Sequence, residues 1–459
     1  MTTKRNAFNA KLTSVAQQCR HAMPWLNFIS ADLCCILLVS AVVRGIYYSV
    51  LLNTKAVDTA SYLNYNANIL LGETERLRTP VYPYFIKLTG LFGRQNLVDN
   101  VVTAQIFISF LSIIPFYRTV QMAFKKRAVI IAAALLYGVM LPVINFDKVL
   151  ITESLSVSFM VVVLYLLVSY LHRPAGIKAV LLGLMVLLAI MLRPAFIYLL
   201  PLVMVFWLLR LIVFKTERKT GLWGLGASFV VIALLIGYSN LNKKHFGFNG
   251  ISAVSNNNQM AVILNANMYK NGNDPEISAA IENNFVQLRK PEAQRGPMVN
   301  LMVRFDGERV HRFLMNCIKN QKMVYAWYIY DTLVKLQTQN MFINYAGHKF
   351  SFLAFRIEEL EGLLFHITFN LLYLFLIPTF GLIAAQWIKL KKVPWLPFML
   401  WLLIVGQIAV AIFGGYADYQ RLILAAIPGL IVLLFSYIDK ISFALDAGKL
   451  KNYPGIGSK

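Results

Sequence analysis

Long apolar runs, separated by short polar and often basic segments, organise this chain of 459 residues. A helix of about 20 apolar residues spans a bilayer. The pattern therefore predicts an all-α polytopic membrane protein with about ten transmembrane helices. We expect the spans at 28–52, 101–117, 129–144, 151–172, 179–192, 194–214, a segment that ends near 238, 365–388, 395–413 and 421–438.

The distribution of charge predicts which loops face the cytoplasm. Lys and Arg number 44 and Asp and Glu 21, which gives a net charge of +23, although only 14% of residues are charged. Basic residues collect in cytoplasmic loops. If the chain starts inside and crosses at each span, its basic clusters all fall inside: 118–127, 172–178, 215–219, 389–392 and the C-terminus. We therefore expect a multi-pass protein with both termini cytoplasmic. Charge scattered in this way argues against nucleic-acid binding.

The same topology divides the chain into segments. We predict a cytoplasmic N-terminus (1–27), a transmembrane module (28–239) with a large outer loop (53–98), an outer domain (240–360), further transmembrane helices (361–438) and a cytoplasmic tail (439–459). The outer domain is the one long polar region, and its segments 283–294 and 307–336 are predicted helical. Asn256-Asn257-Asn258 and the NGNDP motif at 271–275 are typical of turns.

Two carboxylates at the predicted outer face are candidates for chemistry. Asp58 directly follows the first span, and Glu153 opens the fourth. An apolar run follows Glu153 at once, so we expect it to be partly desolvated, as functional carboxylates in membranes often are. Asp58-Thr-Ala-Ser also matches a helix N-cap, so local chemistry leaves capping and catalysis both open. Asp147 fits a solvated turn.

Cationic and aromatic residues accompany these acids on the outer side. Arg193 interrupts the paired spans before Pro194, and Arg421 begins the last span. Each could bind a phosphate through its guanidinium fork or extend to lipid phosphates without a specific ligand. Tyr62 belongs to a predicted interfacial helix, and Arg78 and Tyr82 lie in the motif RTPVYPYF at 78–85.

The order of these features resembles the GT-C membrane glycosyltransferases, and within them the branch of protein O-mannosyltransferases and lipid A aminoarabinose transferases. The resemblance rests on Asp58 after the first span, R-x-P-x-Y-P-x-F leading to LFG, Thr-Glu at the fourth span, Leu-Arg-Pro at 192–194, and Arg-Leu at 421. The match covers roughly the first 200 residues and the last span. Family members often show a second acid after the first and a Tyr after the last arginine, whereas here Thr59 and Leu422 occupy those places.

The resemblance implies an inverting transferase that moves a sugar from a polyprenyl-phosphate donor to a glycolipid, glycan or protein acceptor, at the outer face of a bacterial inner membrane. Asp58 and Glu153 would be catalytic, Arg193 and Arg421 would bind the donor phosphate, and a further set would line the cavity: Tyr62, Arg78, Tyr82 and Asp147. Because the outer domain is basic and aromatic, an anionic acceptor would suit it.

Several alternatives stay open from the sequence. A transporter or flippase of lipid-linked sugars would also have many spans and membrane charges, and an O-antigen ligase or polymerase would act on the same lipid class. The resemblance does not decide whether a divalent metal takes part, and no histidine cluster indicates a metal site. Asp418 and His348 are weaker candidates for outer ligands or acceptor contacts.

Overall fold

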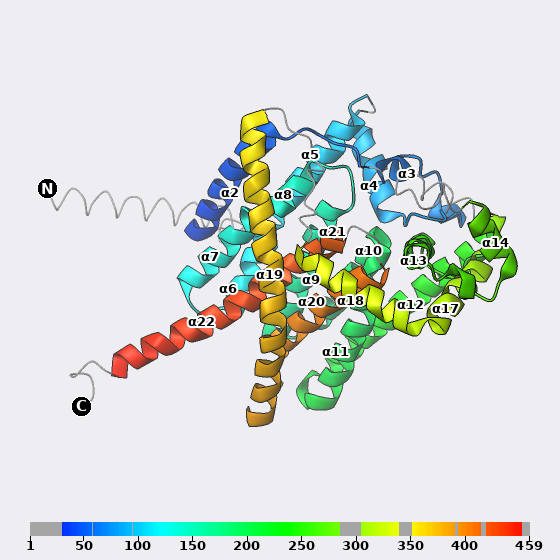
Figure 1. Ribbon diagram of the computed structural model, residues 1–459. Coiled ribbons are helices and arrows are strands. Elements are labelled where there is room, and N and C mark those ends of the chain that lie inside the picture. The colour runs from blue at the N-terminus through cyan, green and yellow to red at the C-terminus, as the bar shows by residue number, and fades with distance from the viewer. Residues whose placement is uncertain are drawn as a thin grey trace.

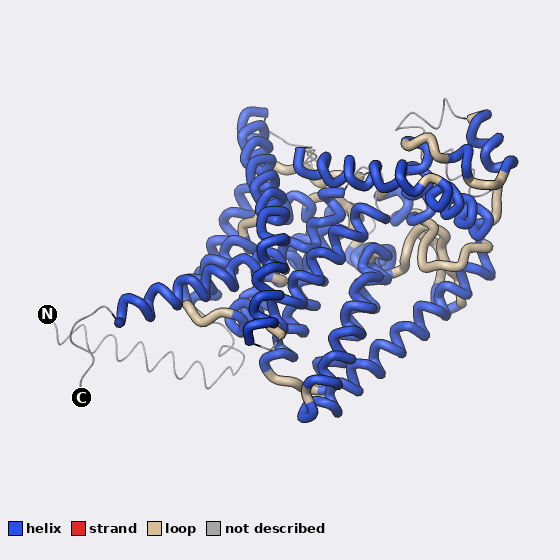
Figure 2. Tube along the Cα trace, turned by 60° about the horizontal axis from the view of Figure 1, so that its bottom comes forward, coloured by secondary structure: helices blue, strands red, loops and turns tan. Residues whose placement is uncertain are grey.

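The protein folds as a bundle of helices, as the computed structural model shows (Figures 1 and 2). The structure describes residues 30–56, 58–93, 95–284, 304–338, 351–390, 393–414 and 419–451. Within these ranges the chain forms helices and loops, with an isolated β-bridge between Thr54 and Val149. The prediction of an all-α protein is confirmed.

Eight helical segments in the described ranges are long and apolar enough to cross a membrane. They are Ala31–Val50 (α2), Leu97–Ala123 (α5 and α6), Arg127–Asp147 (α7 and α8), Glu153–His172 (α9), Pro194–Val213 (η4 and α11), Arg218–Phe246 (α12), Trp395–Gly414 (α20) and Arg421–Ser442, which includes part of α22. Two shorter apolar helices are Gly176–Leu192 (α10) and Leu374–Lys389, within α19 (Ser351–Leu390). These ten segments agree with the predicted spans, and the break at Arg193 falls between α10 and η4.

The individual bounds inside the compound segments are α5 Leu97–Leu111, α6 Ile113–Ala123, α7 Arg127–Gly138, α8 Leu141–Asp147, η4 Pro194–Tyr198, α11 Leu199–Val213, α21 Tyr419–Ile423, η7 Leu424–Ala426 and α22 Ile427–Lys451. The helices outside the bundle are α3 Thr59–Leu63, η2 Ile69–Leu71, α4 Val81–Thr89, η3 Gly90–Phe92, η5 Lys215–Glu217, α13 Val254–Asn265, η6 Tyr269–Asn271, α14 Pro275–Asn283, α17 Gly307–Asn320 and α18 Lys322–Thr338.

Helix α9 is the centre of the bundle. It packs against α5, α6, α10 and α22, and nearly all its residues from Glu153 to Tyr170 are buried. The buried serines Ser154, Ser156 and Ser158 are small, which lets neighbouring helices approach closely. Glycine serves the same purpose between α11 and α12, where a Cβ on Gly224 would come within 2.3 Å of the Trp207 ring. Close helix packing therefore holds the first residue of α9, Glu153, in a defined position.

A second, smaller hydrophobic cluster lies outside the bundle. It is formed by α13, α14, η6 and α17, which lie together at the right of Figure 1, and α13 contacts the end of α20. Residues 307–336 are helical as predicted, and NGNDP is a turn in which Asp274 caps α14. The prediction of a turn at Asn256–Asn258 is wrong, because these residues lie inside α13. Segment 283–294 falls mostly outside the described residues.

Candidate active site

A cavity of about 1090 Å³ lies where the bundle meets the smaller cluster. Its lining comes from the loop and helix after the first span, the start of α9, the break between α10 and η4, the segment 248–261, α17, the end of α20, and Arg421 with Leu422. Asp58, Glu153, Arg193 and Arg421 all contribute to it, as do Tyr62 and Arg78. The structure thus brings together six predicted site residues that are spread over most of the sequence.

Asp58 is held between two arginines. It occupies the N-cap position of α3, but its side chain makes no capping hydrogen bond. Instead, Oδ1 lies 2.9 Å from Nη2 of Arg78 and Oδ2 lies 3.2 Å from Nη2 of Arg421. Local sequence left capping and catalysis both open, and the tertiary fold supplies charged partners for this carboxylate. The Asp58 side chain is 19% exposed, so it remains accessible from the cavity.

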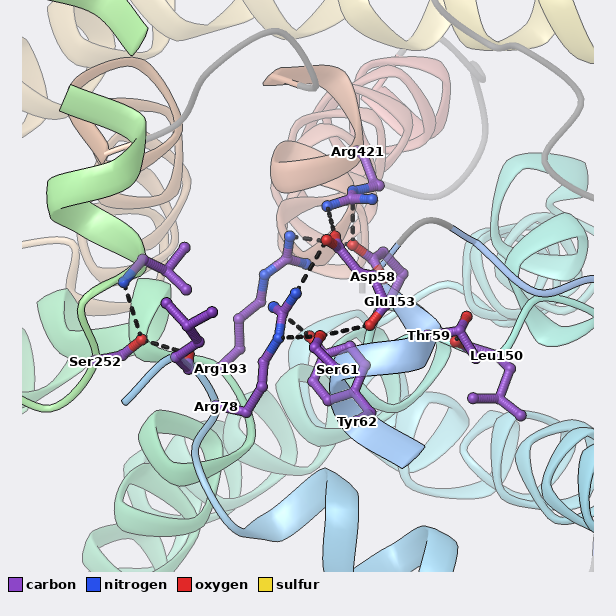
Figure 3. A network of polar contacts seen from close by, with 12 residues as sticks. Asp58, Thr59, Ser61, Tyr62, Arg78, Leu150, Glu153, Arg193, Ser252 and Arg421 are labelled. Atoms are coloured by element: carbon purple, nitrogen blue, oxygen red, sulfur yellow. Dashed lines mark hydrogen bonds and ion pairs between the residues drawn. The ribbon is translucent and has the colours of Figure 1, made fainter. Parts of the chain in front are cut away.

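Glu153 is almost fully buried, with 2% of its side chain exposed. Its Oε1 lies 3.1 Å from Nη2 of Arg193 and 2.9 Å from Nε of Arg421. Both contacts are ion-pair distances rather than aligned hydrogen bonds. The expected desolvation of Glu153 is therefore present. Arg193 and Arg421, with 11% and 14% of their side chains exposed, turn toward the protein instead of extending into lipid (Figure 3).

Arg421 joins the two acids into one network, since it pairs with Asp58 and Glu153 at once (Figure 3). We call Arg78, Arg193 and Arg421 the arginine cluster. Three guanidinium groups face two carboxylates, which leaves one net positive charge at this end of the cavity. A cationic surface built from planar, multi-donor groups suits a phosphate or phosphate ester.

Arg78 and Tyr62 contact each other through a hydrogen bond and a cation–π interaction. Arg78 donates from Nε to Ser61 Oγ at 2.7 Å and from Nη1 to the Tyr62 hydroxyl at 3.0 Å, and its guanidinium lies 4.3 Å from the Tyr62 ring centroid. Ser61 in turn donates to the backbone carbonyl of Asp58 at 2.6 Å. The orientation of Asp58 is thus set through two residues of its own helix and one residue of the following loop.

Two predicted cavity residues do not line the cavity. Tyr82 is fully buried behind Tyr62, with ring centroids 4.9 Å apart, and donates to Gln105 at 2.7 Å. Burial raises the pKa of its phenol well above the usual range. Asp147, predicted to be a solvated turn residue or a cavity residue, is fully buried at the end of α8. The reason is Arg44, whose Nη1 lies 3.1 Å from Asp147 Oδ2.

The turn between α8 and α9 positions the two carboxylates of the site relative to each other. Thr54 donates its N–H to the carbonyl of Lys148 at 2.9 Å and accepts from the N–H of Leu150 at 3.0 Å, and Thr59 Oγ1 donates to the carbonyl of Leu150 at 2.7 Å. These bonds attach the segment that carries Asp58 to the turn that leads into Glu153. The two carboxylates are therefore positioned through one backbone connection.

Sequence reasoning missed Arg44 and Gln105, which support this turn from inside the membrane. Gln105 donates from Nε2 to the carbonyl of Val149 at 2.9 Å, and Arg44 pairs with Asp147. The signal was present, because an arginine inside an apolar span is costly in lipid and implies a buried partner.

Among the residues that the structure describes, no group of three or more His, Cys, Asp or Glu side chains could hold a metal ion. The weaker candidates Asp418 and His348 lie outside the described ranges.

Comparison with known proteins gives a remote structural likeness. The sequence matches no family model and no curated protein. Among solved structures, it is similar to an oligosaccharyltransferase of Archaeoglobus fulgidus with Zn and sulfate (15% identity, TM-score 0.47, 92% of this chain and 52% of that chain). A second structure of that protein, tethered to an acceptor peptide with the NVT sequon, has 14% identity and a TM-score of 0.48, and the match covers 93% of this chain and 51% of that chain. A third, in complex with an inhibitory peptide and a dolichol-phosphate, has 15% identity and a TM-score of 0.48, and the match covers 93% of this chain and 52% of that chain. The chain spans about half the length of these proteins, and at this identity the likeness assigns it neither a family nor an activity.

Proposed function

We propose that the protein is an inverting membrane glycosyltransferase that uses a polyprenyl-phosphate sugar as donor. One observation carries the proposal. Asp58 and Glu153, which come from separate segments, are held by the arginine cluster at one end of a large cavity at the end of a membrane bundle. A glycosyl transfer from a lipid phosphate needs the same two elements, a positioned carboxylate and cationic charge beside the leaving group.

The reaction that this arrangement would perform is a direct displacement. The acceptor hydroxyl oxygen forms a bond to the anomeric carbon, while the bond from that carbon to the phosphate oxygen breaks and its electron pair leaves with the phosphate. Asp58 accepts a hydrogen bond from the acceptor hydroxyl and takes its proton. Arg193 and Arg421 stabilise the negative charge that grows on the departing phosphate. Glu153 holds both arginines in place, at 3.1 and 2.9 Å.

The apolar part of the lining supports a lipid-linked substrate. The break between α10 and η4 contributes Leu192, Pro194 and Ile197 to the cavity lining. Helix α20 contributes Val410 and Phe413. Ile197 and Phe413 are also well exposed on the molecular surface. A donor lying there would have its prenyl chain beside the membrane helices and its phosphate beside the arginine cluster.

The proposal is tested with Asp58→Asn and Glu153→Gln in purified protein supplied with polyprenyl-phosphate monosaccharides. Loss of a positioned base lowers transfer roughly 10²- to 10⁴-fold, so Asp58→Asn should fall in this range. Arg193→Ala should lower transfer roughly 10²- to 10³-fold, in line with the loss of one charge-stabilising donor. Arg193→Lys should recover only part, because a lysine keeps the charge but lacks the planar fork.

The matched control is Glu282→Gln, which removes an exposed carboxylate paired with Lys270 outside the cavity lining. It should transfer sugar at the wild-type rate. The proposal fails if Asp58→Asn, Glu153→Gln and Arg193→Ala all retain wild-type transfer. A transport activity that survives in these variants would favour a flippase instead.

A further inference from the structure

The cavity has a second polar side that the proposed chemistry does not use. Six residues from α13, α17 and the loop before α13 line it, and we call them the amide wall: Asn249, Asn256, Asn257, Asn258, Glu308 and His311. Of the described residues between 248 and 311 that line the cavity, none is lysine or arginine. The cavity is thus divided into a cationic side and a side dominated by neutral amides.

Hydrogen bonds to other helices hold the asparagines of the amide wall in place, although asparagine is a poor helix former. Asn258 donates to the carbonyl of Gly414 at 2.6 Å, which ties α13 to the end of α20. Asn256 is 1% exposed, and its Nδ2 lies 3.5 Å from the carbonyl of Gly307. These long-range contacts explain why three consecutive asparagines continue a helix where a turn was predicted.

The contacts of Asn256 also set the hydrogen-bonding character of His311. With its amide nitrogen toward Gly307, Asn256 presents Oδ1 to Nδ1 of His311 at 3.2 Å. A neutral imidazole then has its proton on Nδ1 and keeps Nε2 as a hydrogen-bond acceptor, on a side chain that lines the cavity. Asn257 also lines the cavity, and its Oδ1 has no hydrogen-bond partner among the described residues.

We propose that the amide wall binds the hydroxyl groups of an uncharged sugar. Asparagine amides offer both donors and acceptors, and a sugar hydroxyl is both as well. The Glu308 carboxylate accepts hydrogen bonds from hydroxyls and repels anionic ligands. This inference rests on the proposed function for its biological meaning, since the sugar would be either that of the donor or that of the acceptor. An uncharged sugar differs from the anionic acceptor that the basic and aromatic content of the outer domain led us to expect.

Binding is measured on the full-length protein in nanodiscs by saturation-transfer difference NMR. The probes are four methyl glycosides (glucoside, mannoside, galactoside and N-acetylglucosaminide) and glucuronate. At least one glycoside should bind, and glucuronate should bind more weakly. Asn257→Ala and His311→Ala should each weaken glycoside binding roughly 2- to 10-fold, the range for the loss of one neutral hydrogen bond. Asn265→Ala is the matched control, because this exposed asparagine ends the same helix outside the cavity lining.

The source of the sugar is distinguished by competition. The polyprenyl phosphate ester of the bound sugar should displace the glycoside if the donor sugar occupies the wall, whereas bare polyprenyl phosphate should not. If neither displaces it, the wall holds the acceptor sugar. The inference is overturned if no glycoside binds, if glucuronate binds as well, or if Asn257→Ala and His311→Ala both bind like wild type. Since this assay needs no turnover, it succeeds or fails independently of the transferase assay.

Discussion

The buried ion pair between Arg44 and Asp147 supports a quantitative prediction about stability. Arg44 is 2% exposed and Asp147 is 0% exposed, and their closest atoms are 3.1 Å apart. Arg44 also donates from Nε to the carbonyl of Gly138 at 3.0 Å and from Nη1 to Ser109 at 2.9 Å. Arg44→Leu removes these contacts, together with a hydrogen bond to the Tyr48 hydroxyl at 3.4 Å, and leaves a carboxylate inside the membrane bundle.

The magnitude follows from what remains around Asp147. The Tyr48 hydroxyl at 2.6 Å and the Ser154 hydroxyl at 2.5 Å still donate to it, but neither carries charge. Removing one partner of a buried pair costs about 3–5 kcal/mol, because the other charge is left uncompensated. We expect Arg44→Leu to lower the free energy of unfolding by about that amount. Replacing both partners, in Arg44→Leu/Asp147→Leu, should cost clearly less than the sum of the two single changes, because no unpaired charge remains.

The assay is equilibrium unfolding in mixed detergent micelles, followed by the fluorescence of the seven tryptophans. Arg127→Leu is the matched control, since Arg127 also pairs with an aspartate, Asp32, but is 76% exposed. It should unfold close to wild type, because exposed ion pairs contribute little. The reasoning is refuted if Arg44→Leu unfolds like Arg127→Leu, or if the two single changes at 44 and 147 are simply additive.

Further predictions concern the smaller hydrophobic cluster and the bundle. The hydrogen bonds from Arg309 hold the pKa of Asp274 below its usual value. The pair therefore stabilises the fold fully above the unfolded-state pKa, which is about 3.9. This stabilisation is lost as the pH falls through the folded-state pKa. Asp274→Asn should therefore lower the melting temperature at pH 7, with a difference that shrinks below pH ~4; an unchanged difference there would contradict the assignment. Burial raises the pKa of the Cys317 thiol to about 12, so a water-soluble maleimide should modify it only after denaturation, as mass spectrometry of the α17 peptide would show. Gly224→Val should reduce the yield of folded protein in size-exclusion chromatography, because its Cβ would lie 2.3 Å from Trp207; Gly226→Val is the control, since a Cβ there meets nothing within 4 Å.

The amino-acid sequence alone predicted the helical spans and six residues that line the cavity. Both signals are local. A run of apolar residues forms a membrane helix whatever its neighbours are, and charges such as Glu153, Arg193 and Arg421 stand out at the ends of such runs. The alternation of the spans placed these charges on one side, and the family resemblance led us to expect them in one cavity.

Only the tertiary structure decided which charges pair. Local patterns left open whether Asp58 caps a helix or serves a site, and suggested that Asp147 is solvated and that Asn256–Asn258 form a turn. In the structure Asp58 pairs with Arg421, and Asp147 pairs with Arg44. Asn258 donates to the carbonyl of Gly414. Each of these partners is distant in sequence from the residue it contacts. A polar side chain in a buried site adopts the conformation that satisfies its charge or hydrogen bonds, and the strongest available partner is supplied by packing. For that reason the choice between a cap and a site, or a turn and a helix, depended on contacts that no local stretch of sequence contains.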